Sequence, residues 1–485
     1  MATQEQLDKY DMTIGIECHV QLATTTKLFS GADNDARTAL PNTVVSPIDF
    51  GLPGMLPVLN REAVTLAIKA GKALGADIAR VSRFDRKHYF YPDLPKGYQT
   101  TQLYHPIILE GLVEAPLDDG STVKVRIHHA HMEEDAGKLT HYGDYSLVDL
   151  NRAGTPLIEI VSEPDIHSPA EAKAYATELY RLMTYAGVTH GDLYHGNMRF
   201  DVNISIAPKG ATELGKRAEV KNLNSFRSVE RAAEYEFHRQ VELVEKGERI
   251  VQETRGWDDA KQKTSSQRSK EDAQDYRYMP DADIPPIVLT DEEIAEVQAT
   301  VPKLPSYYRT VWKDAGFNQD IIDALLLSQP SAEQVERIRE QSDADIAKRV
   351  GFWFLKAVSK QPDADSETVV DQKQLPDKYL IDLARMVADG KLNSNAGDAV
   401  FVEMSVSDET PQQIAERLNL IQESDEGAIA AIVDNVLADP ASAQAVADLR
   451  AGNDKVIGFL VGQVMKKSAG KANPALAQKL IRERL

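Results

Sequence analysis

The stretch IGIECHVQL, residues 14–22, carries the pattern that decides the fold. Apolar and polar residues alternate through it, as in a strand with one buried face, and Glu17 and His19 fall on the polar face. The stretch MRFDVNISI, residues 198–206, repeats the alternation with Asp201 on its polar face. Both stretches are typical of antiparallel sheets that pack one face on a core.

Further strand patterns occur at residues 123–131 and 155–165, and two helices interrupt the series. The first helix is predicted to begin at the capping box SPAE, residues 168–171, and to stop at Gly187. The second is expected from about residue 228 to residue 246. Strands outnumber helices and are not separated by regular crossover helices. The pattern therefore predicts an α+β fold with an antiparallel sheet.

After Pro285 and Pro286 the strand patterns stop, and helical spacing continues to the C-terminus. The polar segment 261–278, just before this change, is predicted to be a mobile loop. Charge then reverses along the helical region. Residues 405–451 hold nine acidic and two basic side chains, whereas residues 452–485 hold seven basic and two acidic ones.

Composition narrows the classes of protein. The 485 residues suggest about three domains. The net charge of −20 argues against non-specific attachment to membranes or nucleic acid, although a local basic patch can still bind a polyanion. One cysteine, Cys18, excludes an intrachain disulfide and a Cys-rich zinc site. No signal peptide is visible and no apolar run approaches the roughly 20 residues of a membrane span, so we expect a cytoplasmic protein.

Carboxylates concentrate on the predicted strands. Glu17 and His19 share one strand face, and the runs HMEEDAGK (131–138) and DLNRAGTPLIEIVSEPD (149–165) add further acids, among them Glu159 between two isoleucines. Carboxylates this dense repel one another unless cations lie among them. Their density therefore favours a site that binds a divalent metal ion and phosphate. The solvated polar face of an antiparallel sheet would show the same alternation, and the spacing leaves both interpretations open.

The stretch FDRKHYFYPDLPKGYQ, residues 84–99, mixes basic side chains with aromatic rings. Cations for phosphates beside rings for stacking would suit a nucleotide or a tRNA 3′ end. An aromatic core segment with a basic rim is the alternative. The chain contains no G-x-x-x-x-G-K-[ST] motif, so any use of ATP would not involve a P-loop.

Together these stretches resemble one family, the B subunits of the bacterial glutamyl-tRNA(Gln)/aspartyl-tRNA(Asn) amidotransferase. They occur in family order and cover the chain from end to end. The resemblance is also carried by GLPGMLPVLN (51–60), AEVKNLNSF (218–226), QETRGWD (252–258), DYRYMPDADIPP (275–286) and GFLVGQVMKKSAGKANP (458–474).

The resemblance implies three domains: a cradle built on an antiparallel sheet (1–292), an all-helical connector (293–408) and a helical YqeY-like tail (409–485). The cradle would use ATP and Mg²⁺ to phosphorylate the side-chain carboxylate of misacylated Glu-tRNA(Gln) or Asp-tRNA(Asn). Ammonia, freed from glutamine by an amidase A subunit, would displace the phosphate, and a small C subunit would complete the heterotrimer. A non-catalytic tRNA-binding scaffold and a free-standing metal-dependent ligase for small carboxylates are the rival functions.

The resemblance also implies site residues. The catalytic set is Glu17, His19, Glu133, Glu134 and Glu159, and the metal-facing members are Glu17, His19, Glu134 and Glu159. Candidates for nucleotide or phosphate binding are Arg86, Lys87, Lys96, Arg152 and Arg199. Lys466, Lys467 and Lys471 in the basic tail are expected to contact the tRNA body.

Two departures from the family pattern have consequences. Where some members carry a four-cysteine zinc knuckle, this chain has Ser30, Ala32, Ser46 and Asp49, so no zinc is expected. Where the family often reads EGS, this chain has His195 followed by Gly196 and Asn197, which leaves the role of His195 open.

Overall fold

The computed structural model describes residues 2–269, 275–359, 374–422, 426–468 and 471–485. The chain divides into two compact units, Met1–Tyr307 and Tyr308–Leu485. The first combines sheets with helices and the second is helical, so the predicted α+β class is confirmed. The finer division at residues 292/293 and 408/409 stays a prediction.

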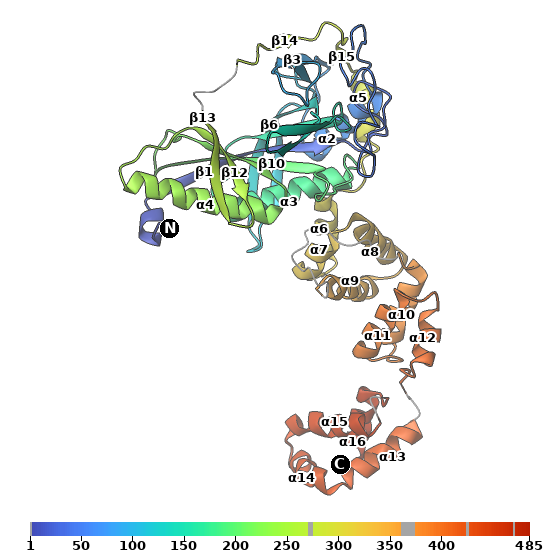
Figure 1. Ribbon diagram of the computed structural model, residues 1–485. Coiled ribbons are helices and arrows are strands. Elements are labelled where there is room, and N and C mark those ends of the chain that lie inside the picture. The colour runs from blue at the N-terminus through green and yellow to red at the C-terminus, as the bar shows by residue number, and fades with distance from the viewer. Residues whose placement is uncertain (1, 270–274, 360–373, 423–425, 469–470) are drawn as a thin grey trace. The chain divides into compact units, whose positions relative to one another are not determined.

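An eight-stranded sheet organises the first unit (Figure 1). Its spatial order is β13-β12-β11-β10-β1-β9-β6-β5. These strands are β1 (Tyr10–Gln21), β5 (Gly111–Pro116), β6 (Thr122–Glu134), β9 (Pro156–Ser162), β10 (Met198–Pro208), β11 (Ala218–Leu223), β12 (Glu253–Asp258) and β13 (Lys263–Ser269). Every neighbouring pair is antiparallel except β11 and β12, which are parallel because α4 (Phe226–Glu245) crosses between them.

The alternation of apolar residues in β1 gives the sheet one buried face. Ile14, Ile16, Cys18 and Val20 are almost fully buried in the main core. Helices α3 (Pro169–Tyr185) and α4 lie along this face in Figure 1. The opposite, polar face therefore remains for charged side chains.

Both predicted helices are present. The side chain of Ser168 caps α3 by accepting the Glu171 backbone N–H, and Gly187, with φ of +69°, follows the end of the helix. Helix α4 begins two residues earlier than expected, because Ser225 supplies its cap. The remaining helices of this unit are α1 (Gln4–Leu7), α2 (Arg61–Ala73) and α5 (Asp291–Gln298).

Short strands form three small sheets beside the large one. Strands β3 (Asp85–His88), β4 (Tyr98–Thr101) and β14 (Met279–Pro280) make the first, β2 (Val81–Ser82) and β15 (Ile287–Val288) the second, and β7 (Lys138–Tyr142) and β8 (Tyr145–Asp149) the third.

The predicted loop 261–278 needs a correction. Its residues Lys263–Ser269 form β13, which pairs antiparallel with β12. The polar composition is that of an edge strand. A strand at the edge of a sheet pairs on one side only, and polar side chains there discourage pairing with another chain. Residues 270–274 of that predicted loop lie outside the described part of the chain.

The second unit confirms the prediction of helices to the C-terminus. It contains α6 (Pro305–Asp314, which begins at the unit boundary), α7 (Gln319–Leu325), α8 (Gln329–Gln341), α9 (Ala344–Ser359), α10 (Asp377–Ala388), α11 (Ser394–Met404), α12 (Pro411–Arg417), α13 (Glu426–Leu437), α14 (Ala443–Arg450), α15 (Ile457–Lys467) and α16 (Pro474–Arg484). Helices α13, α15 and α16 share their own apolar core around Val433, Leu460 and Leu480. Among the described helices, none is both long and apolar enough to cross a bilayer.

Candidate functional site

The polar face of the sheet gathers charged side chains around β1. The register places Glu159 of β9 opposite His19, and His131 of β6 opposite Glu159 on its other side. It also places Asp201 of β10 opposite Glu17. Directly opposite residues lie about 5 Å apart, so strand pairing joins acids and histidines from distant parts of the sequence.

The first group of possible metal ligands is His19, Glu133 and Glu159, whose donor atoms all lie within 4.8 Å of one another. His19 Nδ1 lies 3.1 Å from Glu133 Oε1, and His131 Nε2 lies 3.3 Å from Glu159 Oε2. Burial alone would lower the pKa of His19, but the hydrogen bond to Glu133 and the charge of Glu159 raise it to about 9. Burial likewise opposes ionisation of Glu159, yet the hydrogen bond with His131 holds its pKa below the usual range.

The second group is Glu17, Asp201 and Glu219, again with donor atoms within 4.8 Å. Lys221 Nζ lies 2.8 Å from oxygens of both Asp201 and Glu219, and Asn203 donates to Glu17 at 3.0 Å. Burial and then repulsion by Glu159 raise the pKa of Glu17. A cation between these oxygens would relieve that repulsion.

The donor chemistry of both groups fits divalent metal ions. The all-oxygen group of Glu17, Asp201 and Glu219 suits Mg²⁺. The group with His19 suits an ion such as Mn²⁺ that accepts imidazole as well as carboxylate. Because His19 is protonated with its present partners, metal binding there would release a proton.

The structure does not bring Glu134 to either group. Adjacent residues of a strand point to opposite faces, so Glu133 reaches His19 while Glu134 turns away. Glu134 is ion-paired with Lys96 and accepts the Thr100 backbone N–H at 2.9 Å. The metal role of Glu134 stays a prediction, whereas Glu133 lies with His19 and Glu159.

Of the five basic candidates, Lys87 faces the first group. Burial would lower its pKa, but the charges of Glu133 and then Glu159 raise it. Its Nζ lies 5.1 Å from the centre of the Tyr276 ring. A lysine in this position can neutralise charge that develops beside the carboxylates.

Arg199 and Arg152 converge on one acid. Arg199 Nη2 lies 3.1 Å and Arg152 Nε 3.3 Å from Asp135 Oδ2. Arg199 is also the cross-strand neighbour of His19, so this pair of guanidinium groups lies at the edge of the first group. Arg86 instead forms ion pairs with Asp281 and Asp283.

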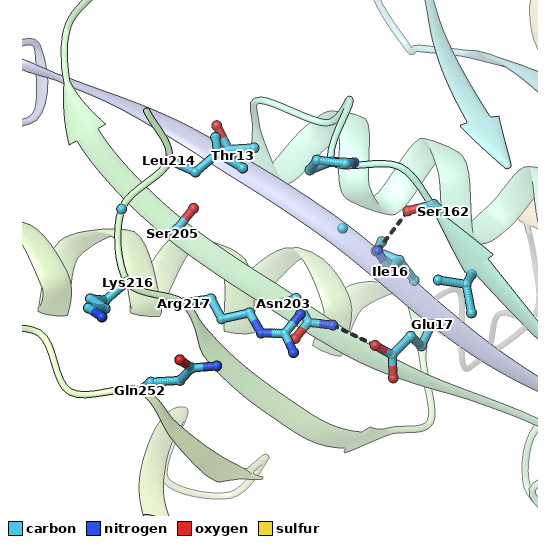
Figure 2. A pocket seen from close by; sticks show the side chains of 14 residues that line it. Thr13, Ile16, Glu17, Ser162, Asn203, Ser205, Leu214, Lys216, Arg217 and Gln252 are labelled. Atoms are coloured by element: carbon cyan, nitrogen blue, oxygen red, sulfur yellow. Dashed lines mark hydrogen bonds between the residues drawn. The ribbon is translucent and has the colours of Figure 1, made fainter. Parts of the chain in front are cut away.

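A cavity of about 640 Å³ lies beside Glu17 (Figure 2). Leu214 contributes an apolar side chain to its lining, which also includes the core residue Ile16, and Lys216 and Arg217 contribute positive charge. The remaining lining residues are Thr13, Gly15, Glu17, Val161, Ser162, Pro164, Asn203, Ser205, Gly215 and Gln252. Figure 2 shows Arg217, Asn203 and Glu17 directed toward one another. Apolar surface, cations and metal-type oxygens side by side are what a nucleoside triphosphate requires.

Sequence reasoning missed Asp201, Glu219, Lys216 and Arg217 as functional residues. Asp201 lay on the polar face of a predicted strand, and its pairing with Glu17 was the missing information. Lys216 and Arg217 directly precede the family stretch AEVKNLNSF. That position in the sequence could have indicated that they belong to the site.

The positions at which some family members carry zinc-binding cysteines are here joined by hydrogen bonds around Asp49. Ser30 Oγ and the Ser46 backbone N–H donate to Asp49 Oδ2 at 3.0 and 2.9 Å. The buried Lys27 Nζ lies 3.5 Å from the same oxygen, and burial lowers the pKa of Lys27. Ala32 contributes its carbonyl to the Lys27 backbone N–H.

His195 forms a local contact in an exposed turn, with Nδ1 2.6 Å from Asp192 Oδ2. The structure gives it no contact with either ligand group among the described residues.

The three tail lysines differ in their surroundings. Lys467 Nζ pairs with Asp439 at 2.9 Å, and Lys471 Nζ donates to Asn419 Oδ1 at 3.0 Å. Lys466 is exposed at the end of α15.

A sheet face with two groups of metal-type ligands beside a cationic cavity is the kind of site that a catalytic domain carries. The family model described as the GatB/GatE catalytic domain matches residues 12–295, and the model described as the GatB domain matches residues 333–485. The chain belongs to this family, the B subunits of aspartyl/glutamyl-tRNA(Asn/Gln) amidotransferases.

Relatives match over nearly their whole length. The B subunit of the aspartyl/glutamyl-tRNA(Asn/Gln) amidotransferase from Brevibacillus brevis is 43% identical, and the match covers 98% of this chain and 99% of the relative. The B subunits of the same name from Alcanivorax borkumensis and Halorhodospira halophila are 45% and 44% identical at the same coverage.

Proposed function

We propose that this chain is the carboxylate-activating subunit of a tRNA-dependent amidotransferase. ATP would phosphorylate the side-chain carboxylate of Glu-tRNA(Gln) or Asp-tRNA(Asn), and ammonia would convert the product to Gln-tRNA(Gln) or Asn-tRNA(Asn). The observation that carries the proposal is the pair of ligand groups beside a cationic cavity on one sheet face. An A subunit with amidase activity and a small C subunit would complete the assembly in the cytoplasm.

The chemistry explains why such a site needs charge more than a nucleophile. A carboxylate resists ammonia because its oxygen is a poor leaving group. Phosphoryl transfer to that oxygen gives an acyl phosphate. Attack by ammonia on the carbonyl carbon then forms the C–N bond, breaks the C–O bond and releases phosphate and a proton. Positioning and charge neutralisation supply most of the catalysis in such transfers.

The chain's own residues can meet these needs. His19, Glu133 and Glu159 would hold one divalent ion, and Glu17, Asp201 and Glu219 a second, replacing Glu134 of the predicted set. Bound Mg²⁺ would neutralise phosphate charge. Lys87 would stabilise charge at the transferring group, while Arg152 and Arg199, placed on Asp135, would orient the anionic substrate.

The cavity beside Glu17 is our candidate for the nucleotide. Leu214 would pack on the base, and Lys216 and Arg217 would contact phosphates. Glu17 lines the cavity and belongs to the second ligand group, so phosphates there would meet that group directly.

The scaffold alternative is disfavoured by burial. Glu133 and Asp201 are only 3% and 5% exposed, and buried carboxylates are costly without a compensating role or partner. A purely tRNA-binding protein would not need two such groups.

The test uses the complex purified with its A and C subunits. ADP release is measured with ATP, Mg²⁺ and each misacylated tRNA. We expect release that requires a misacylated tRNA, and amide formation when glutamine is added. Amide formation without ATP consumption, or no reaction with either tRNA, would contradict the proposal.

Two variants compare Glu159, a member of the first group, with Glu134, which lies outside both groups. Glu159→Gln should weaken Mn²⁺ binding, followed by electron paramagnetic resonance, by about 10-fold or more, and should abolish ADP release. Glu134→Gln should keep its Mn²⁺ affinity. Glu114→Gln, an exposed acid on β5 paired with Lys124, is the matched control. Equal loss of Mn²⁺ in the Glu134 and Glu159 variants would restore Glu134 to the metal site.

A further inference from the structure

Arg86 and Lys87 are consecutive residues of β3 and therefore point to opposite sides of that strand. The charges of Glu133 and Glu159 raise the pKa of Lys87. Arg86 faces away from them. Its Nε and Nη2 donate to the two carboxylate oxygens of Asp281 at 3.0 and 3.1 Å, and Nη2 also donates to Asp283 at 2.8 Å.

The two acids belong to the segment 275–283, which lies against β3. Its strand β14 pairs with β3, with Met279 opposite Arg86, and the Asp281 backbone N–H donates to the Phe84 carbonyl at 2.9 Å. The same segment carries Tyr276, whose carbonyl accepts the His88 backbone N–H at 2.8 Å. The Arg86 ion pairs thus hold this segment on the strand that carries Lys87.

One ring of this segment, Tyr276, packs against the lysine. Lys87 Nζ lies 5.1 Å from the centre of the Tyr276 ring, which in turn lies 6.1 Å from the ring of Tyr89. A cation over an aromatic face is attracted to it and loses rotational freedom. The position of Tyr276 therefore limits where the Lys87 ammonium can lie relative to the carboxylates.

We propose that Arg86 is a positioning residue. Through Asp281 and Asp283 it fixes segment 275–283, so that Tyr276 holds Lys87 over the His19–Glu133–Glu159 group. This inference rests on the proposed function and assigns Arg86 a role other than phosphate binding. Bidentate Arg–carboxylate pairs combine strength with fixed geometry, which suits this task. Asp281 is 6% exposed, so its side chain is shielded from competing water.

A double-mutant cycle in the complex tests the proposal. Arg86→Gln, Asp281→Asn and the double variant are compared for ADP release with saturating misacylated tRNA. We expect each single variant to lower kcat by about tenfold or more, because a displaced Lys87 no longer meets the reacting group. The KM for ATP should stay within about twofold. The double variant should lose no more than the stronger single one, since both break the same contact.

A phosphate-binding role for Arg86 predicts a different pattern. Arg86→Gln would then raise the KM for ATP, and Asp281→Asn, which removes the bidentate partner of the arginine, would keep the wild-type kcat. Either of these results, or additive losses in the double variant, would overturn the proposal. Arg86→Lys adds a second criterion. It keeps the charge but cannot make the bidentate contact, so kcat should still fall.

The matched control is a chemically identical pair away from the site. Arg126 on β6 donates to both oxygens of Asp165 at 2.9 and 2.7 Å. Arg126→Gln should leave kcat unchanged, and thermal unfolding should show that all the variants fold. A wild-type complex without tRNA-dependent ADP release would refute the proposed function itself, which separates the two failures.

Discussion

The protonation of His19 depends on the side chains around it. Its imidazole contacts Glu133 at 3.1 Å and lies 3.9 Å from Asp201. These acids raise its pKa to about 9 although burial opposes the charged form. Without a metal ion the histidine is thus a cation that neutralises the acids, and a divalent ion would take over that role.

His129 leads to a prediction about acid stability. Burial, followed by the charges of His131 and His128, lowers its pKa from 6.5 to about 4. The unfolded chain therefore binds more protons than the folded chain between pH 6.5 and pH 4, and this residue's stabilising contribution is lost as the pH falls through that window. We expect His129→Gln to lose less stability between pH 7 and pH 4.5 than the wild type.

Urea unfolding at several pH values measures this difference. His141→Gln, in the exposed β7–β8 hairpin where His141 contacts only Ser146 among the described hydrogen bonds, is the control and should follow the wild type. An identical pH dependence in the His129 variant and the wild type would show that the imidazole ionises freely.

At the scale of elements, a buried ion-pair network joins α4 to the edge of the large sheet. Glu236 of α4 is fully buried, accepts three hydrogen bonds from Arg239 and lies 3.0 Å from Arg255 Nε of β12. Arg255 also donates to Thr264 of β13 at 2.8 Å. This network fixes the hairpin of β12 and β13, whose polar surface gives it few apolar contacts.

Breaking this network should release the hairpin. Glu236→Gln would take the fully buried anion away from Arg239 and Arg255, which keep only Glu253 among the ion pairs described for them. Removing one partner of a buried ion pair costs about 3–5 kcal/mol. We expect faster hydrogen exchange of the β12 and β13 amides and a lower urea midpoint. Asp258→Asn, at the exposed end of β12, should change neither. Unaltered exchange in Glu236→Gln would mean that backbone pairing alone holds the hairpin.

At the scale of the whole molecule, the basic tail is less cationic than its composition indicates. Besides Lys467, Arg482 pairs with Asp454 and Arg484 with Asp434. Acidic side chains of the same chain therefore neutralise much of the positive charge from which tRNA binding by the tail was predicted. The tRNA contact by Lys466, Lys467 and Lys471 stays a prediction, but the three need not contribute equally.

We expect Lys466→Ala to weaken tRNA binding more than Lys467→Ala does. Lys466 is exposed, whereas Lys467 already has an anionic partner and releases fewer counterions on binding. Loss of a phosphate contact should reduce the slope of log affinity against log salt by about 1. Filter binding by the complex at several salt concentrations measures this slope. Equal effects of both substitutions would show that tRNA displaces Asp439.

The sequence by itself determined the fold class and which face of the sheet carries the acids. Alternation in residues 14–22 and 198–206 required a one-sided antiparallel sheet, because a period of two separates apolar from polar side chains. The same alternation put Glu17, His19 and Asp201 on a single polar face.

Only the tertiary structure decided which acids act together. Strand register set Glu159 between His19 and His131, and local alternation sent Glu133 to that group but Glu134 to Lys96. The fold also pairs Arg86 with Asp281 and Asp283, almost 200 positions later in the sequence. Pairing partners and ion-pair partners are long-range contacts, and no local sequence pattern encodes them because they form only when the strands meet in the folded sheet.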